Sequence, residues 1–257
     1  MGSIRDKVGY ICDMDGVIYH GNRLLDGARE FVQWLLDNDK KFLFLTNSSE
    51  RSPRELQEKL ARMGLNVTED HFYTSALATA SFLARQEPNG TAYVIGEAGL
   101  HKALYDVGFS MNDVNPDYVV VGETRDYNYR HMEKAVRLVL KGAKLVGTNP
   151  DLTGPTETGI GPACRALIAP IELATFREAY FVGKPNPLMM RHAQKKLGCT
   201  RAETLIIGDR MDTDIIAGIE SEIETVLVLS GVSNENTPNL FPYSPDHILT
   251  GVGDIPS

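Results

Sequence analysis

Two acidic residues follow the first apolar stretch of the chain and have the spacing of a cation site. Asp13 and Asp15 come directly after Val8–Cys12, in the order Asp-Met-Asp-Gly. Residues two apart on an extended chain point to the same side, so two such carboxylates repel each other. A divalent cation relieves that repulsion, and oxygen ligands favour Mg²⁺. The alternative is a surface turn, because Asp and Gly are common turn residues.

Two further positions carry groups suited to an anion. Thr46 and Asn47 follow the apolar stretch Phe42–Leu45, and their hydroxyl, amide and backbone donors suit a phosphoryl oxygen. The alternative is that Thr46 and Ser48 only cap the turn. Lys184 stands between a glycine and a proline, directly after another apolar stretch. This placement gives its side chain little room along the surface, so we expect the ammonium to point into the same crevice. The alternative is an ordinary solvated lysine.

A second acidic cluster follows the apolar stretch Thr204–Ile207. It contains Asp209, Asp212 and Asp214 within six residues. Asp209 ends the expected strand and Asp214 falls in the first turn of the expected helix, so these two are the better metal candidates. Asp212 is placed to be a helix cap or a solvated surface acid.

These positions are held by elements typical of an α/β protein. Short stretches rich in Val, Ile and Leu alternate with segments of helical period, which indicates a mostly parallel sheet. The expected strands are Val8–Cys12, Lys41–Thr46, Ala92–Ile95, Tyr118–Val121, Lys144–Gly147, Tyr180–Val182, Thr204–Ile207 and Thr225–Leu229. The expected helices cover residues 27–38, 53–63, 76–86, 98–106, 129–141, 161–174, 187–197 and 213–219. Ligands of such sheets bind at the carboxyl ends of the strands, where the polar clusters stand.

The distribution of the polar clusters predicts two domains. Strands ending near residues 12, 46, 182 and 207 lead into polar motifs, whereas those between about 90 and 150 are followed by far fewer side chains suited to catalysis or ligand binding. We therefore expect a catalytic core of residues 1–77 and 178–257 with an inserted module of residues 78–177. Within the insert, segment 148–151 and an expected turn at 159–162 are candidate substrate contacts or, alternatively, plain turns.

Composition limits the partners. The chain has 257 residues, of which 42% are hydrophobic and 23% charged, so it is globular. Its net charge of −8 argues against a nucleic-acid partner. No apolar run approaches the roughly 18–20 residues that span a bilayer, and the first residues lack the apolar stretch of a signal peptide. The three cysteines form no CxxC pair, which indicates a reducing compartment. We expect a cytoplasmic protein without a membrane partner.

The polar clusters also occur in a definite order: DxDG, then TN, then K, then GDxxxTD. This ordered set resembles the four motifs of the haloacid dehalogenase (HAD) superfamily over the whole chain. The stretches Asp13–Ile18, Leu45–Asn47 and Val182–Pro185 are similar to those of its NagD-like subfamily, class IIA, which has a large α/β cap between the second and third motifs. The resemblance implies a Rossmann-like parallel-sheet core with residues 78–177 as the cap, closing over the site.

The resemblance also implies roles for the acidic residues. Asp13 would be the nucleophile that forms an aspartyl-phosphate, and Asp15 would contact the substrate as the acid that protonates the leaving group and then as the base that activates water. Mg²⁺ would be held by Asp13, the backbone carbonyl of Asp15 and Asp209. Asp214 would hold a water molecule bound to the metal.

The same resemblance implies that Thr46, Asn47 and Lys184 bind the phosphoryl oxygens. A carboxylate at position 15 disfavours dehalogenase and phosphonatase chemistry, and the single helix that fits between Gly16 and Thr46 disfavours a mutase. We therefore expect a Mg²⁺-dependent phosphatase of small phosphate monoesters such as nucleotide monophosphates, sugar or glycerol phosphates and p-nitrophenyl phosphate. Pairing through the cap, which is common among related proteins, implies a homodimer.

Two other functions stay open at this point. One is a signalling or binding module that accepts a phosphoryl group, as receiver domains do, although such domains are much shorter and lack an insert. The other is a catalytically silent nucleotide-binding protein, against which the missing GxGxxG pattern after the first strand argues.

Overall fold

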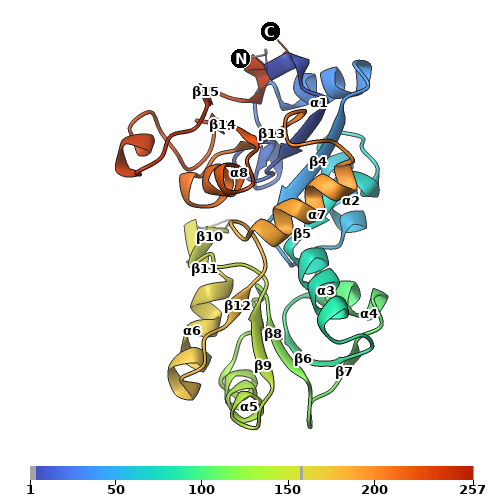
Figure 1. Cartoon of the computed structure of the whole chain (residues 1–257), viewed down its shortest axis with the longest axis vertical. Helices are drawn as coiled ribbons and strands as arrows, with labels where there is room; N and C mark the ends of the chain where they lie inside the picture. Colours follow the sequence, from blue (N-terminus) through green and yellow to red (C-terminus); the bar gives the residue numbers. More distant parts are fainter. Residues whose placement is uncertain (1–3, 157–158, 257) are drawn as a thin grey trace. The chain divides into compact units, whose positions relative to one another are not determined.

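The computed structural model describes residues 4–156 and 159–256 and divides the chain into two compact units (Figure 1). Unit 1 comprises Met1–Thr46, Pro53–Tyr73 and Lys184–Ser257, and unit 2 comprises Asn47–Ser52 and Thr74–Gly183. Each unit has its own parallel sheet, so the predicted α/β class is confirmed. The proposed insert, 78–177, falls inside unit 2, which also takes in the short segment Asn47–Ser52.

Unit 1 is built on a six-stranded sheet with the order β15-β14-β13-β1-β4-β5. The strands are β1 (Gly9–Cys12), β4 (Lys41–Thr46), β5 (Phe72–Thr74), β13 (Thr204–Gly208), β14 (Glu224–Val228) and β15 (His247–Leu249). From β15 to β4 every neighbouring pair is parallel. β4 and β5 lie on one side of β1, and β13, β14 and β15 lie on the other, so the strand order switches at β1. In open α/β sheets, ligands bind at such a switch point.

The helices of unit 1 are α1 (Ala28–Asp37), α2 (Pro53–Arg62), α7 (Pro187–Leu197) and α8 (Ile216–Glu220). Helix α1 buries Ala28, Phe31, Val32 and Leu35, which recur at helical spacing and form one apolar stripe. Burying each large side chain of this kind contributes about 1.5–3 kcal/mol. These residues join Tyr10 and other strand residues in a single core. A small hairpin of β2 (Tyr19–His20) and β3 (Arg23–Leu24) lies between β1 and α1 in the chain.

Unit 2 has a five-stranded sheet with the order β12-β9-β8-β6-β7, in which all neighbours are parallel. Its strands are β6 (Thr91–Ile95), β7 (Ser110–Met111), β8 (Tyr118–Val121), β9 (Lys144–Gly147) and β12 (Tyr180–Phe181). Its helices are α3 (Ser75–Gln86), α4 (Ala98–Asp106), α5 (Tyr129–Leu140) and α6 (Cys164–Thr175). Helix α3 packs against α4, and α5 against α6.

Two sequence-based expectations about elements are wrong. The segment 159–162 is not a turn but strand β11 (Gly159–Pro162), which pairs antiparallel with β10 (Thr153–Thr156), so α6 begins at Cys164 rather than near residue 161. The helix expected at 213–219 is preceded by a π-helical turn over Met211–Ile215, and α8 begins only at Ile216. Glycine and proline suggested a turn in the first case, but pairing with the neighbouring strand β10 holds the segment in extended backbone.

The helices of the described residues include none that is both long and apolar enough to cross a membrane.

Candidate active site

Two aspartates stand side by side at the carboxyl ends of neighbouring strands. Asp13 follows β1, and its backbone N–H donates to the carbonyl of Ile207 on β13 at 2.8 Å. Asp209 follows β13 directly. After Asp13 the chain turns back sharply, because Gly16 adopts a φ of +80° and its N–H donates to the Tyr19 carbonyl at 2.8 Å. Parallel pairing of β1 and β13 therefore brings together two acids that are far apart in the sequence.

A third acid completes the cluster. Asp13, Asp209 and Asp214 each offer a carboxylate oxygen, and these oxygens all lie within 4.8 Å of one another. Asp214 is held inward because its Oδ2 accepts from the backbone N–H of Arg210, where the π-helical turn begins. Asp209 and Asp214 are buried, and Asp13 keeps 14% of its side chain exposed. Three crowded carboxylates of this kind are a candidate cation site.

The surroundings of Asp209 fit a cation. Its Oδ2 accepts from the backbone N–H of Val232 at 2.7 Å. Its Oδ1 is buried and has no hydrogen-bond partner among the described residues. A buried, unsatisfied carboxylate oxygen is costly in free energy, and a divalent cation satisfies it. The residues present therefore fit a divalent metal.

Lys184 reaches the same cluster from the other side. Its Nζ lies 2.7 Å from Asp13 Oδ1 and 2.6 Å from Asp214 Oδ1, and it donates to the carbonyl of Leu45 at 3.2 Å. The side chain is only 2% exposed. The structure thus places Lys184 inside the site, between the ends of β4 and β13.

The charges in the cluster do not balance. Burial raises the pKa of Asp13 to about 8; the charges of Asp214 and Asp209 add to that effect, while Lys184 opposes it. Burial also raises the pKa of Asp209 to about 7, with the charge of Asp214 as the next cause. For Lys184, burial lowers the pKa, but the charges of Asp13 and Asp214 outweigh it and leave the pKa raised. One ammonium faces three carboxylates, so the site attracts a further cation.

Asp15 lies apart from this cluster and faces His20. Its Oδ1 is 3.4 Å from His20 Nδ1, and 41% of its side chain is exposed. Burial raises the pKa of Asp15, while His20 and Lys59 oppose the shift. A raised pKa favours the protonated form, as a general acid requires. Lys59 is buried, with its ammonium 3.7 Å from the centre of the Tyr19 ring.

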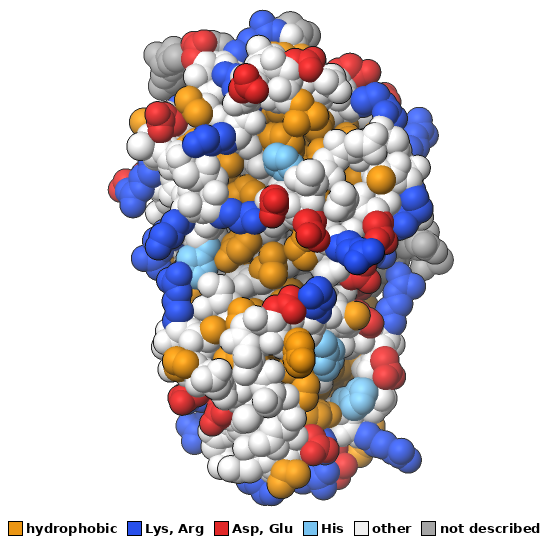
Figure 2. All heavy atoms as spheres, turned by 90° about the vertical axis from the view of Figure 1, so that its right-hand side faces the viewer, with side chains coloured by type: hydrophobic (Ala, Val, Ile, Leu, Met, Phe, Trp, Pro, Cys, Tyr) orange, Lys and Arg blue, Asp and Glu red, His pale blue; other side chains and the backbone are white. Residues whose placement is uncertain are grey.

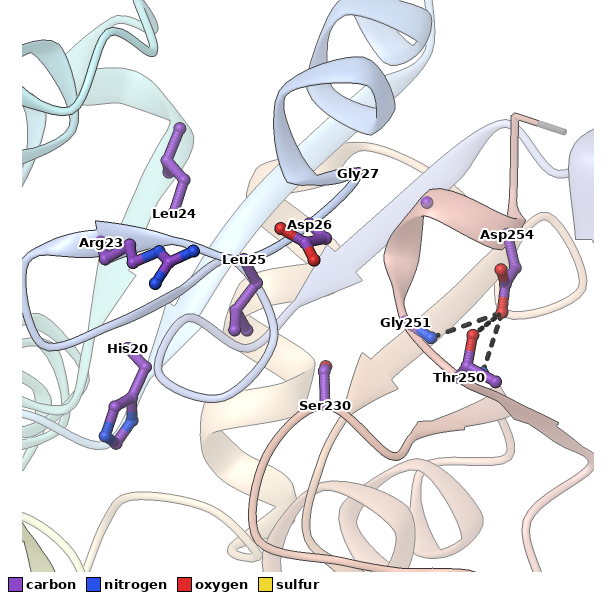
Figure 3. Close-up of a pocket in the computed structure, with 11 residues that line it drawn as sticks. His20, Arg23, Leu24, Leu25, Asp26, Gly27, Ser230, Thr250, Gly251 and Asp254 are labelled. Carbon is purple, nitrogen blue, oxygen red and sulfur yellow. Dashed lines mark hydrogen bonds between the residues drawn. The ribbon is translucent and has the colours of Figure 1, made fainter.

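A cavity of about 730 Å³ lies beside the Asp15 loop within unit 1. Figure 3 shows His20 and Arg23 of the β2–β3 hairpin, the turn before α1, Ser230 and the segment 250–254 around it. Ser230 Oγ donates to the Gly16 carbonyl at 2.8 Å, so this cavity borders the loop that carries Asp15. Asp254 Oδ2 accepts hydrogen bonds from the backbone N–H and hydroxyl of Thr250 and from the backbone N–H of Gly251 (Figure 3).

Two glycines make the acid cluster possible. A Cβ at Gly208 would collide with the Asp214 side chain, and a Cβ at Gly231 would collide with Asp209 Oδ2. Gly208 could be found from its place in the GDxxxTD motif. Gly231 lies outside every motif, as do Val232 and Ser230, so none of the three carries a signal in the sequence.

Thr46 and Asn47 are adjacent in sequence but belong to different units. Thr46 ends β4 in unit 1, and its side chain is buried. Asn47 opens unit 2, where its Nδ2 donates to Asp151 Oδ2 at 3.0 Å. Its carbonyl accepts from Asn149 Nδ2 at 2.7 Å and from Ser75 Oγ. The candidate segment 148–151 therefore contacts Asn47.

Asp212 stands outside the acid cluster. It is exposed and pairs with Arg210, whose terminal nitrogen lies 2.8 Å from Asp212 Oδ2. The structure thus brings together Asp13, Lys184, Asp209 and Asp214 and leaves Asp212 at the surface.

Comparisons with known proteins identify the family that this chain resembles. A model described as haloacid dehalogenase-like hydrolase matches residues 10–110, and one described as HAD-hydrolase-like matches residues 181–255. Dihydroxyacetone phosphatase of Corynebacterium glutamicum is 44% identical over 249 residues, covering 97% of this chain and 90% of that protein. Ribonucleotide monophosphatase NagD of Escherichia coli is 44% identical over 245 residues, covering 95% of this chain and 96% of that protein. The solved structure of p-nitrophenyl phosphatase from Archaeoglobus fulgidus matches with a TM-score of 0.92 at 37% identity, covering 97% of this chain and 98% of that one.

Proposed function

We propose a catalytic role for Asp13 from the premise that the chain belongs to the haloacid dehalogenase-like hydrolase family and is a phosphatase of phosphoric monoesters. Asp13 is the residue that accepts the phosphoryl group. The observation that carries this proposal is the position of Asp13 at the end of β1, 2.7 Å from the buried ammonium of Lys184. A carboxylate held next to a fixed positive charge can act as a nucleophile towards phosphorus, because the approaching anion is attracted to the same place.

The metal proposed for the site is Mg²⁺. Asp13, Asp209 and the backbone carbonyl of Asp15 would hold it, and Asp214 would hold a water molecule next to it. The unsatisfied Oδ1 of Asp209 and the all-oxygen set of ligands support this choice. When bound, Mg²⁺ supplies positive charge that offsets the negative charge of the phosphoryl oxygens.

The chain's own residues divide the reaction into two steps. Asp13 attacks phosphorus, and the bond from phosphorus to the leaving oxygen breaks as Asp15 donates a proton to that oxygen. Asp15, now ionised, then takes a proton from water, which attacks the aspartyl-phosphate and releases orthophosphate and free Asp13. Lys184, Thr46 and Asn47 would bind the phosphoryl oxygens throughout. A positioned proton donor of this kind contributes about 10²–10⁴-fold to the rate.

Small phosphate monoesters are the proposed substrates. The names of the relatives refer to dihydroxyacetone, ribonucleotide and p-nitrophenyl substrates. We extend the class to sugar and glycerol phosphates, whose leaving groups are similarly small and polar. On the face drawn in Figure 2, Lys and Arg side chains are interspersed with Asp and Glu, which argues against a polymeric anion as substrate.

Two further properties belong to the proposal. A homodimer through unit 2 is supported by the exposed apolar side chains of Leu173 and Phe176, near the end of α6, which are 77% and 93% exposed. A cytoplasmic location is supported by three cysteines that are all free.

Phosphate release tests the proposal. Wild type, Asp13→Asn and Asp212→Asn are assayed on a panel of phosphorylated metabolites and p-nitrophenyl phosphate, with Mg²⁺ and with EDTA. We expect Asp13→Asn to lose activity by about 10³-fold or more, because it lacks the nucleophile. Asp212→Asn, a matched change at an exposed residue, should stay within about twofold of wild type. Activity retained in Asp13→Asn, or wild type inactive on every ester, would overturn the proposal.

A further inference from the structure

Unit 2 contains a carboxylate that the proposed mechanism does not use. Glu123 follows β8 and accepts from the Ser49 backbone N–H at 3.2 Å, from Ser49 Oγ and from Asn149 Nδ2. Burial of the carboxylate raises the pKa of Glu123, and the hydrogen bonds from Ser49 and Asn149 oppose that shift. Within the described parts of unit 2, the partners of Glu123 are neutral hydrogen-bond donors and not cations. A half-buried acid with this environment must be held by its donors.

The same donors hold the segment that contains Asn47. Asn149 Nδ2 donates both to Glu123 Oε1 and to the backbone carbonyl of Asn47, the latter at 2.7 Å. Ser49, the other partner of Glu123, lies two residues after Asn47. Ser49 and Asn149 are fully buried. Glu123 is therefore linked to both ends of segment 47–49.

The side chain of Asn47 is oriented through the other end of the Asn149 amide. Asn149 Oδ1 accepts from the backbone N–H of Asp151 at 3.1 Å. Asp151 Oδ2 in turn accepts from Asn47 Nδ2 at 3.0 Å. The orientation of the Asn149 amide thus bears on both the backbone of Asn47, which Ser75 Oγ also holds, and the side chain of Asn47.

A carboxylate at position 123 fixes the orientation of that amide. An ionised carboxylate only accepts hydrogen bonds, so Asn149 must direct its NH₂ group to Glu123 and its Oδ1 to Asp151. An amide at position 123 could present its own NH₂ group instead. That NH₂ group would face the NH₂ group of Asn149, so the hydrogen bond between residues 123 and 149 would be lost. The Asn149 amide would then be held less firmly against the Asn47 carbonyl and the Asp151 N–H.

The end of β9 also holds the residue next to Lys184. The N–H of Gly183 donates to the Thr148 carbonyl at 2.7 Å. A Cβ at Gly183 would lie 2.7 Å from Asn47 Oδ1, so this position also confines the Asn47 amide. Within unit 2, Thr148 and Asn149 therefore contact both Asn47 and Gly183, the residue that precedes Lys184 in the chain.

We infer that Glu123 is a positioning residue for phosphoryl binding: by fixing the amide of Asn149, it holds Asn47 in the orientation that binds a phosphoryl oxygen. This inference rests on the proposed function, in which Asn47 contacts the substrate. Glu123 itself touches neither the substrate nor the reacting atoms.

The test compares Glu123→Gln with a matched control. Glu97→Gln makes the same change in unit 2, after β6, where Glu97 Oε1 accepts from Thr124 Oγ1 at 2.7 Å and from the Arg125 N–H at 3.2 Å. We measure KM and kcat for p-nitrophenyl phosphate, and the binding of orthophosphate by calorimetry, both with saturating Mg²⁺. We expect Glu123→Gln to weaken orthophosphate binding and raise KM by about tenfold, with a smaller fall in kcat. Glu97→Gln should match wild type in all three.

A second variant keeps the inference testable if Glu123→Gln does not fold. Asp151→Ala removes the acceptor of the Asn47 amide at a half-buried position and should weaken orthophosphate binding to a similar extent. Folded Glu123→Gln with orthophosphate binding within about twofold of wild type would overturn the inference, as would an equal loss in Glu97→Gln. Failure of the proposed function is distinguishable, because it appears in wild type and Asp13→Asn turnover, whereas this inference is read from orthophosphate binding.

Discussion

The ammonium of Lys184 lies 2.6 Å from Asp214 Oδ1, and both side chains are almost completely buried. Asp214 also accepts from the Arg210 N–H, so its carboxylate is fixed from two directions. Held there, Lys184 can reach Asp13 with the same nitrogen. The pair therefore acts as the support that aims a positive charge at the proposed nucleophile.

Removing that charge should impair both catalysis and folding. Lys184→Met keeps the length of the side chain but leaves Asp13 and Asp214 buried without their ammonium. Breaking a buried ion pair costs about 3–5 kcal/mol, and we expect a loss of this order in the free energy of unfolding, measured with urea in EDTA. Turnover of p-nitrophenyl phosphate should fall by about 10²-fold or more.

Lys196→Met is the control for Lys184→Met. Lys196 is exposed on α7, the helix that follows Lys184 in the chain. It should match wild type in stability and turnover. A Lys184→Met variant with near wild-type turnover would show that the ammonium does not serve the reaction.

The close approach of Gly231 to Asp209 makes a separate prediction about the metal. In Gly231→Ala the new methyl group would collide with Asp209 Oδ2 and force that oxygen to move. Because Asp209 is buried and bonded to the Val232 N–H, we also expect the free energy of unfolding to fall by about 1–3 kcal/mol. The Mg²⁺ concentration for half-maximal activity should rise about tenfold or more, as when groups supporting a metal ligand are lost.

Gly251→Ala provides the comparison, because the nearest atom to its Cβ, in Ser230, is 3.9 Å away. Its Mg²⁺ dependence should be that of wild type. An unchanged Mg²⁺ requirement in Gly231→Ala would exclude Asp209 as a metal ligand held by this contact.

The acid cluster should make stability depend on pH when no divalent cation is bound. Burial raises the pKa of Asp13 to about 8 and that of Asp209 to about 7, from an ordinary value of 3.8. The folded chain then binds protons more readily than the unfolded chain, so this contribution is complete below 3.8 and is lost as pH rises to about 8. In EDTA, the free energy of unfolding should fall as the pH rises from about 4 to about 8.

Urea unfolding at a series of pH values measures this dependence. Asp209→Asn removes one of the titrating groups and should make the decline shallower, and saturating Mg²⁺ should do so in wild type because the metal binds the deprotonated carboxylates. A stability in EDTA that rises over this range in wild type would contradict the raised pKa values.

The long buried strands could be predicted because apolar residues fill both faces of a parallel sheet. β4, β8 and β9 have the predicted bounds, and the family and fold class are confirmed. Strands of two or three residues, such as β2, β7 and β15, carry no periodic signal and were missed. The π-helical turn at Asp214 was also missed, since Asp214 is held by a tertiary contact with Lys184 in addition to the local bond from the Arg210 N–H.

Most site residues could be found in the sequence because they lie within two positions of the end of a predicted strand. Asp13, Asp209 and Lys184 do so, and the structure places their charged groups together. Glu123 lies in a region where little chemistry was expected, and its partner Ser49 is 74 positions away in the sequence. Gly231 matters only because of the space that it leaves open for Asp209. Such relations depend on three-dimensional distances, which a single sequence does not contain.

The chain passes between the two units after Thr46, Ser52, Tyr73 and Gly183. Two of these passages separate neighbouring motif residues, Thr46 from Asn47 and Gly183 from Lys184. Unit 2 therefore cannot be exchanged between proteins independently of the motif residue Asn47. A recombination event that replaced it whole would also replace Asn47 and the residues that hold it. A chimaera built for altered specificity should therefore keep 47–52 and 148–151 from the same parent, because Asn149 and Asp151 are bonded to Asn47.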